Sequence, residues 1–203
     1  MQDFRNCKKV FYDELVLYVH PEVYEPAEDS FALAKQVPAL AKGDVLDIGT
    51  GTGLLALVAK SEDSDVTGVD ISEVAVENAR FNASQNGLEC KFLASDLFNE
   101  VDGDFDLIIF NPPYLPTGEG EVVKGNLDKA WNGGGSGREV IDRFLDNFQF
   151  FLKPEGSVLT LASSLSGVSQ TLAKLKKHGF SPKVAEEVKL FHETLSVIVA
   201  KRG

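Results

Sequence analysis

Two consecutive prolines directly after a strand-like run constrain the fold of this chain more than any other feature. The run Phe105-Asp106-Leu107-Ile108-Ile109-Phe110 is aromatic and β-branched, which is typical of a buried strand. It continues without a gap into Asn111-Pro112-Pro113-Tyr114. Because proline cannot donate to a sheet ladder and disfavours helix for the residue before it, the chain must leave the sheet here in a rigid, extended turn.

The same turn has a chemical use. It would hold the side-chain amide of Asn111 and the backbone carbonyl of Pro112 in fixed directions, with the ring of Tyr114 close by. Two acceptors and an aromatic face suit a planar NH2 group, such as a carboxamide or a base amine. Since Asn-Pro is also a common turn starter, the motif taken alone leaves an ordinary strand-end turn equally open.

A glycine-rich turn upstream favours a ligand site. A short apolar strand begins at Asp44, and a helical pattern over residues 54–60 follows the turn. Glycines let the backbone approach a ligand at the carboxyl end of a strand, where open α/β sheets bind ligands. The alternating glycines do not fit the dinucleotide fingerprint, and no lysine closes a phosphate loop, so a nucleoside without a pyrophosphate is favoured. The turn residues predicted to bind it are Asp47, Gly49, Thr50, Gly51 and Gly53.

Acidic residues end the next two predicted strands. The strand over residues 65–69 ends in Asp70, whose carboxylate can accept both ribose hydroxyls or can cap the helix that follows. The strand over residues 89–94 leads to Asp96 and Leu97. Asp96 could accept an adenine amine while Leu97 packs on the ring. Each acid alone has an ordinary explanation, but a glycine turn and two acids at three successive strand ends seldom occur together by chance.

The order of these motifs resembles a class I S-adenosylmethionine-dependent methyltransferase of the amino-methylating kind. Residues 23–31 (VYEPAEDSF) and residues 130–144 (AWNGGGSGREVIDRF) sharpen the resemblance. Together the segments resemble the HemK-like release-factor glutamine methyltransferases, in their archaeal and eukaryotic branch. The resemblance runs from about residue 23 to residue 196, which is nearly the whole chain.

The resemblance implies a reaction and a set of site residues. A methyl group would pass from S-adenosyl-L-methionine, leaving S-adenosyl-L-homocysteine, to the side-chain amide nitrogen of the glutamine in the Gly-Gly-Gln motif of a class I translation release factor. Asn111 Oδ1 and the Pro112 carbonyl would accept the two amide hydrogens, and Tyr114 would stack on the amide. The implied substrate-binding residues are Asn111, Pro112, Pro113 and Tyr114. The implied donor-binding residues are Ser30, Asp47, Gly49, Thr50, Gly51, Gly53, Asp70, Ile71, Asp96, Leu97 and Asn111.

Three other functions stay open. The Asn-Pro-Pro-Tyr turn also serves nucleic-acid adenine or guanine methyltransferases, a lysine amine could use the same pocket, and a non-catalytic S-adenosylmethionine-binding subunit would share the fold. The net charge of −11 counts against a nucleic-acid track, which needs a basic patch. The intact turn counts against a non-catalytic subunit. Cys7 and Cys90 lack metal-ligand spacing, so no metal site is predicted.

The alternation of strands and helices predicts an α/β fold, a Rossmann-like doubly wound seven-stranded sheet that is mostly parallel with an antiparallel C-terminal strand. The 203 residues suit a single domain. Pro26 is expected in the first turn of a helix, and residues 156–161 are expected as a strand. The stretches 184–191 and 195–200 are expected as an antiparallel pair. Residues 1–40 would close over the donor, and the Gly-rich residues 115–136 would form a substrate loop, with Trp131 as its anchor or as a packing residue.

The third predicted strand, over residues 89–94, falls on the sheet edge in the usual strand order of this fold. Cys90, Phe92 and Ala94 would share one face, with Lys91 and Leu93 on the other. An exposed edge is a template for strand addition. The family branch implies a small zinc-binding activator protein docked there as a heterodimer. No apolar stretch of membrane-spanning length and no signal-peptide pattern occur, so a cytoplasmic location is expected.

Overall fold

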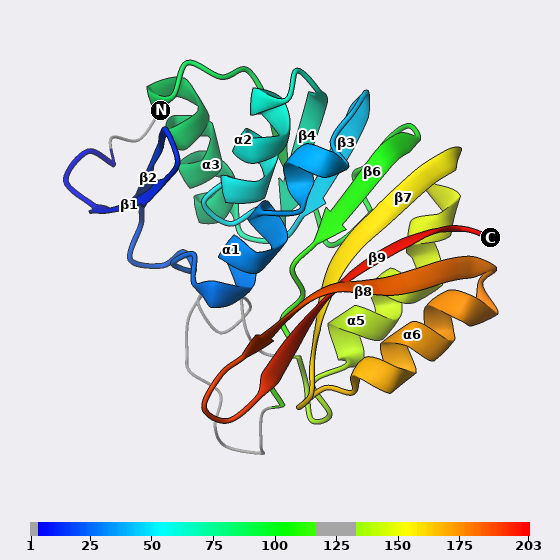
Figure 1. Cartoon of the computed structure of the whole chain (residues 1–203). Coiled ribbons are helices and arrows are strands. Elements are labelled where there is room, and N and C mark those ends of the chain that lie inside the picture. Colours follow the sequence, from blue (N-terminus) through cyan, green and yellow to red (C-terminus); the bar gives the residue numbers. More distant parts are fainter. Residues whose placement is uncertain (1–3, 117–132) are drawn as a thin grey trace.

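A twisted seven-stranded sheet with helices on both faces forms the body of the protein (Figure 1). The computed structural model describes residues 4–116 and 133–203. All strands of the sheet run parallel except the last in sequence, which is antiparallel to both its neighbours. In spatial order they are β5 (Lys91–Ala94), β4 (Asp65–Asp70), β3 (Asp44–Ile48), β6 (Phe105–Phe110), β7 (Leu152–Ser163), β9 (Thr194–Arg202) and β8 (Phe180–Lys189).

Each face of the sheet has its own apolar core, because side chains alternate along every strand. In β6, Leu107 and Ile109 pack on one side, while Ile108 and Phe110 pack on the other. The first side is covered by α1 (Glu28–Ala34), the 3-10 turn η1 (Val37–Ala39), α2 (Leu54–Ser61) and α3 (Glu73–Gln85). The second side is covered by α5 (Glu139–Asn147), η2 (Phe148–Phe150) and α6 (Val168–Lys177). The apolar run that predicted β6 is therefore buried on both faces.

The strand order of the sheet has a switch point between β3 and β6. Strands β3, β4 and β5 succeed one another toward one edge, and β6 then returns to pair with the other side of β3. Loops that leave β3 and β6 at such a point diverge to opposite faces of the sheet and open a crevice at the carboxyl ends of the strands. The glycine turn and the Asn-Pro-Pro-Tyr turn are the two segments that leave β3 and β6 here.

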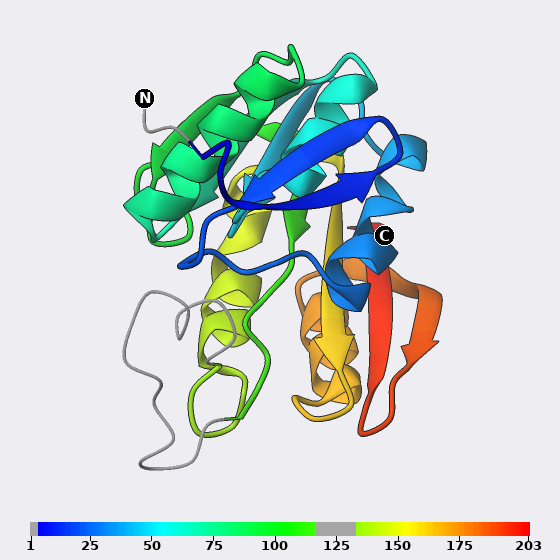
Figure 2. The same ribbon diagram turned by 90° about the vertical axis from the view of Figure 1, so that its left-hand side faces the viewer.

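An N-terminal hairpin of β1 (Lys8–Tyr12) and β2 (Leu15–Val19) lies on the outside of the layer that holds α2 and α3 (Figure 2). Three asparagines of α3, or of its C-terminal end, bind the backbone of β2 or its continuation. The side chain of Asn86 binds the N–H and the carbonyl of Val16, and that of Asn82 binds the N–H and the carbonyl of Tyr18. The side chain of Asn78 binds the N–H of His20 and the carbonyl of Tyr18. All six hydrogen bonds are 2.8–3.0 Å long. We call Asn78, Asn82 and Asn86 the asparagine ladder. It occupies one edge of the hairpin in place of a third strand.

The predicted fold class is confirmed, including the antiparallel strand β9 and the position of β5 at an edge of the sheet. Several predicted element boundaries were wrong. Pro26 precedes the N-cap residue Ala27 and so lies before α1 rather than in its first turn. Strand β5 begins only at Lys91, and β8 spans residues 180–189 instead of 184–191. The strand predicted at residues 156–161 extends over residues 152–163.

Most of the proposed substrate loop, including Trp131, lies outside the described residues. Its last part forms a turn of glycines, in which the N–H of Gly133 donates to the carbonyl of Leu115 at 3.0 Å. Among the helices of residues 4–116 and 133–203, we find none long and apolar enough to cross a lipid bilayer.

Candidate active site

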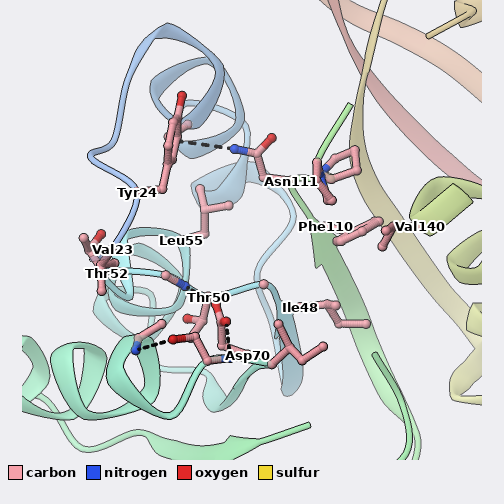
Figure 3. A pocket seen from close by; sticks show the side chains of 18 of the residues that line it. Val23, Tyr24, Ile48, Thr50, Thr52, Leu55, Asp70, Phe110, Asn111 and Val140 are labelled. Carbon is pink, nitrogen blue, oxygen red and sulfur yellow. Dashed lines mark hydrogen bonds between the residues drawn. The ribbon is translucent and has the colours of Figure 1, made fainter. Parts of the chain in front are cut away.

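A cavity of about 510 Å³ opens at the carboxyl ends of β3, β4 and β6. Its volume falls in the range of roughly 300–1,000 Å³ that is usual for small-molecule and cofactor sites. Figure 3 shows Tyr24 and Asn111 at one end and Asp70 at the other. The predicted residues that line it are Ser30, Gly49, Thr50, Gly51, Asp70, Ile71, Asp96, Leu97, Asn111, Pro112, Pro113 and Tyr114. Asp47 and Gly53 lie behind this wall.

The glycine turn bends into the cavity between β3 and α2. Gly49 and Gly51 have φ angles of 67° and 54°, in the left-handed region that side chains rarely adopt. The backbone N–H of Thr50 donates to the carbonyl of Val69 at 2.9 Å, which ties the turn to the end of β4. The turn thereby brings its backbone to the wall of the cavity.

Asp70, the last residue of β4, holds two loops together and still faces the cavity. Its Oδ2 accepts the N–H of Gly51 and its Oδ1 accepts the N–H of Ser72, each at 2.9 Å. Ser72 is the N-cap of α3, so the capping function considered for Asp70 is carried out by its neighbour. A carboxylate is an acceptor-only group with about four lone-pair directions, and Asp70 lines the cavity. This ability to accept hydrogen bonds suits the two hydroxyls of a ribose.

Asp47 stabilises the glycine turn from below. It is fully buried, and its Oδ2 accepts the Thr50 hydroxyl at 2.7 Å and the N–H of Ala56 in α2 at 3.1 Å. Burial is the largest influence on this carboxyl and raises its pKa to about 7, against the two hydrogen bonds that lower it. Its other oxygen, Oδ1, has no hydrogen-bond partner among the described residues. Asp47 therefore shapes the turn without reaching the cavity.

The third strand end supplies an acid and an apolar side chain. Asp96 and Leu97 both line the cavity, and Leu97 has a φ of 52°, which is rare for a residue with a side chain. The hydroxyl of Ser95 donates to the carbonyl of Leu97 at 2.9 Å and holds this turn. Arg143 of α5 donates to Asp96 at 2.8 Å and lines the same end. This end offers an acceptor beside an apolar surface, as an adenine ring would require.

At the opposite end, the amide of Asn111 is oriented by a carboxylate from α1. Its Nδ2 donates to Asp29 Oδ2 at 2.9 Å and lies 3.4 Å from Ser30 Oγ. Its Oδ1 is buried and has no hydrogen-bond partner among the described residues. In Figure 3 the dashed line from Asn111 runs from its nitrogen toward the Tyr24 side, and its oxygen points the other way.

The backbone of Tyr114 packs against the glycine turn that precedes α5. Gly137 has a φ of 70°, and a Cβ atom there would come within 2.5 Å of the Tyr114 carbonyl oxygen. Burial raises the pKa of the Tyr114 hydroxyl, and the charges of Asp29, Glu193 and Glu28 raise it further. The phenol is therefore neutral, and Tyr114 lines a cavity end that carries negative charge.

Two contacts of the site were missed by sequence reasoning. Asp29 belongs to the same motif as Ser30 but had no assigned role. Arg143 lies within the motif of residues 130–144 but had no assigned role. Both residues are charged and lie inside motifs that already contain predicted site residues, and this position was the signal that could have identified them.

Comparisons with known proteins agree with this geometry. The family model described as "Methyltransferase small domain" matches residues 24–189. A chain of Methanocaldococcus jannaschii, provisionally named a protein N5-glutamine methyltransferase, is 46% identical over 92% of this chain and 95% of its own. The human methyltransferase HEMK2 is 31% identical over 87% of this chain and 88% of its own.

A solved structure has the same architecture. The E. cuniculi Mtq2–Trm112 complex, responsible for methylation of the eRF1 translation termination factor, contains a chain with a TM-score of 0.72 and 26% identity, covering 90% of this chain and 99% of that one. The match of the family model over most of the chain and the two relatives of nearly full coverage lead to one conclusion. This chain belongs to the methyltransferase small-domain family and is an S-adenosylmethionine-dependent methyltransferase.

Proposed function

We propose that this methyltransferase methylates the side-chain amide nitrogen of the glutamine in the Gly-Gly-Gln motif of a class I translation release factor. The observation that carries the proposal is the amide of Asn111, whose buried Oδ1 lies in the segment with Pro112 and Tyr114 and has no hydrogen-bond partner within residues 4–116 and 133–203. The names of the M. jannaschii relative and of the E. cuniculi complex support the same substrate. A release-factor methyltransferase would act in the cytoplasm, where translation occurs.

The donor would lie along the cavity from Asp70 to Asn111. Asp70 would accept the ribose hydroxyls, Asp96 the adenine amine, and Ile71 and Leu97 would pack on the ring. The turn of Gly49, Thr50 and Gly51 would approach the donor with its backbone, while Asp47 and Gly53 support that turn. Ser30 and the N-terminal segment of residues 1–40 would close over the other end. When bound, S-adenosylmethionine supplies a methyl group activated on a sulfonium ion.

The acceptor end must position a weak nucleophile. The lone pair of a carboxamide nitrogen is delocalised into its carbonyl, so catalysis depends on orientation and electrostatics rather than on a strong base. Asn111 Oδ1 and the Pro112 carbonyl would accept the two N–H groups and direct the nitrogen toward the donor. Tyr114 would stack on the amide plane and exclude water. As the carbon–nitrogen bond forms, the bond between the methyl carbon and the donor sulfur breaks and leaves a neutral thioether, and the nitrogen releases one proton to water. Because Asn111 Oδ1 is covered by its neighbours, the acceptor must move side chains at the mouth to reach it.

The experiment uses labelled S-adenosylmethionine, the full chain and recombinant release factor, with tRNA and DNA as competing acceptors. Label should enter the release factor and disappear when the glutamine of its Gly-Gly-Gln motif is replaced by alanine. Label that persists in that variant would contradict the proposal. Label on a lysine or in nucleic acid only would favour one of the alternative substrates instead.

We also infer that the edge strand β5 binds a small partner protein. Strand β5 has only four residues and pairs with β4 on one side. Arg80 of α3 donates to the carbonyl of Phe92, so one of its acceptors is already in use. Leu93 and the exposed Lys91 lie on the face opposite to Phe92. The E. cuniculi chain is solved with Trm112, which supports a small protein partner for this chain. The family branch implies that this partner binds zinc and docks at this edge.

Hydrogen exchange tests the partner site. Mixing the chain with its own counterpart of Trm112 should slow exchange of the β5 amides and increase methylation. The amides of β8, at the opposite edge of the sheet, serve as the control and should not change. Full activity of the isolated chain with no protection of β5 in the mixture would contradict this partner site.

A further inference from the structure

The carboxylate of Asp29 is enclosed by four hydrogen-bond donors. Its Oδ2 accepts Asn111 Nδ2 at 2.9 Å. Its Oδ1 accepts the N–H of Ser30 at 2.7 Å, the Ser30 hydroxyl at 3.2 Å and the Tyr24 hydroxyl at 3.2 Å. Only 5% of the residue is exposed, and it lies in the first turn of α1, where the helix dipole favours a negative charge. Its position is therefore tightly fixed.

This carboxylate decides which way the amide of Asn111 faces. An amide has a donor end and an acceptor end of similar shape, whereas an ionised carboxylate has only acceptors. With the amide turned over, Asn111 Oδ1 would meet Asp29 Oδ2, and two acceptors would oppose each other without a proton between them. The nitrogen must therefore face Asp29, which leaves Oδ1 as the end that an acceptor meets once the side chains at the mouth have moved.

The negative charge behind the amide also strengthens that oxygen as an acceptor. A hydrogen bond donated to a carboxylate polarises the donating group, and hydrogen bonds in a chain reinforce one another in a medium of low dielectric constant. The result is a carbonyl oxygen of increased negative character, supported by an acid that the substrate never touches. An acceptor nitrogen that gains positive charge during methyl transfer is stabilised by such an oxygen.

We propose that Asp29 is a positioning residue that acts through Asn111 and makes the acceptor site selective for N–H donors. The proposal rests on the function proposed above, because it assigns to Asn111 the contact with the acceptor. A carboxamide or an amine satisfies the fixed oxygen. A carboxylate of the same shape, such as a glutamate in place of the glutamine, sets an oxygen against it and is rejected. Sites built around a hydrogen bond to one substrate group discriminate strongly against analogues that cannot make it.

A double-mutant cycle tests whether Asp29 acts through Asn111. In the wild-type background, Asp29→Asn should lower kcat on the order of 10²-fold, as the loss of a preorganised contact does. The dissociation constant of S-adenosylmethionine, measured by calorimetry, and the KM of the release factor should change by no more than about threefold. In the Asn111→Ala background, the same substitution should lower kcat little further. An equal loss in both backgrounds would overturn the proposal.

The matched control is Glu28→Gln. Glu28 is the neighbouring acid in the same helical turn, is exposed, and makes no contact with Asn111 in the described structure. Removing its charge should alter kcat by less than about threefold, because exposed charges are screened. A loss as large as that of Asp29→Asn would mean that general charge, rather than amide orientation, is responsible.

A spectroscopic measurement separates this inference from the substrate. The side-chain NH2 resonances of Asn111, assigned by their loss in Asn111→Ala, should show one proton shifted downfield by the carboxylate, and Asp29→Asn should remove that shift. The result requires no release factor, so a wild-type enzyme that ignores the release factor overturns the proposed function alone. Unshifted NH2 resonances in the wild type would overturn the role of Asp29 even if the release factor is methylated.

Discussion

Oδ2 of Asp47 accepts the hydroxyl hydrogen of Thr50 at 2.7 Å, beneath the turn that faces the cavity. The carboxyl is fully buried, and burial raises its pKa from 3.8 to about 7 despite this bond. The folded chain therefore binds the proton more tightly than the unfolded chain. Stability should fall as the pH rises from about 4 to about 7, by an amount on the order of 4 kcal/mol for this group, and should level off above that.

Asp47→Asn should remove most of this decline, because the side chain can then no longer ionise. Urea unfolding of both proteins between pH 4 and pH 8 measures it. Both proteins should keep a loss of stability at lower pH, where Asp106 is protonated: its hydrogen bond with Lys153 holds the pKa of that carboxyl below its usual value. Parallel profiles of the two proteins from pH 4 to pH 8 would contradict the assignment to Asp47.

Asp70→Ala should weaken donor binding. The substitution removes the proposed acceptor of two ribose hydroxyls and also the anchor of Gly51 and Ser72. A hydrogen bond to a charged group contributes about 1.5–3 kcal/mol, so the dissociation constant should rise roughly 10- to 100-fold, with a smaller effect on turnover at saturating donor. Asp65→Ala, at the exposed start of the same strand, is the control and should leave calorimetric binding unchanged.

Asn111→Ala should leave donor binding nearly intact and abolish most turnover. Removing one preorganised contact to the transition state typically lowers the rate on the order of 10²–10³-fold. Single-turnover methylation at saturating donor isolates the chemical step. Turnover close to that of the wild type would show that the Asn-Pro-Pro-Tyr segment is a structural turn and not the acceptor site.

Tyr114→Phe should retain much more activity than Tyr114→Ala. The proposed contact is the ring face, and the hydroxyl makes no hydrogen bond to the acceptor in that arrangement. Initial rates of release-factor methylation at several substrate concentrations distinguish the two variants. Equal losses for both substitutions would instead assign the role to the hydroxyl.

Asn82→Ala should destabilise the N-terminal hairpin. Asn82 is fully buried and binds both backbone groups of Tyr18 and the carbonyl of Thr52. Leaving buried polar groups without partners costs about 1–3 kcal/mol each, so a loss on the order of 2–3 kcal/mol is expected. Hydrogen exchange at Tyr18 should accelerate. Asn86→Ala, at the less buried end of the asparagine ladder, should have a smaller effect.

Local patterns in the sequence were enough to predict the sheet and most of the residues that line the cavity. The buried run of β6 and its two prolines specify a strand and its end without any distant information. The glycine turn and Asp70 are equally local. Strand alternation could even have placed Asp47 correctly, because it shares a face with Val45 and so points at α2 rather than into the cavity.

Contacts between distant segments could not be predicted in this way. The hydrogen bond between Asp29 and Asn111 joins residues 82 positions apart, and no periodicity connects α1 with the end of β6. Strand β7 was predicted too short because Lys153, Pro154 and Glu155 interrupt its apolar pattern. Those residues lie where the pairing of β6 with β7 shifts register, so tertiary pairing rather than propensity extends the strand.

The asparagine ladder limits how far a helix can replace a strand. Equivalent side chains recur every four residues along a helix, or about 6.0 Å, whereas equivalent backbone groups recur every two residues along a strand, or about 6.6 Å. The two spacings therefore drift apart by about 0.6 Å at each step. Between Asn78 and Asn86 the drift reaches only about 1.2 Å, which small side-chain adjustments absorb, but a fourth or fifth step would exceed the tolerance of a hydrogen bond. A hairpin fastened in this way has a natural maximum length, and lengthening β2 would not strengthen its attachment to α3.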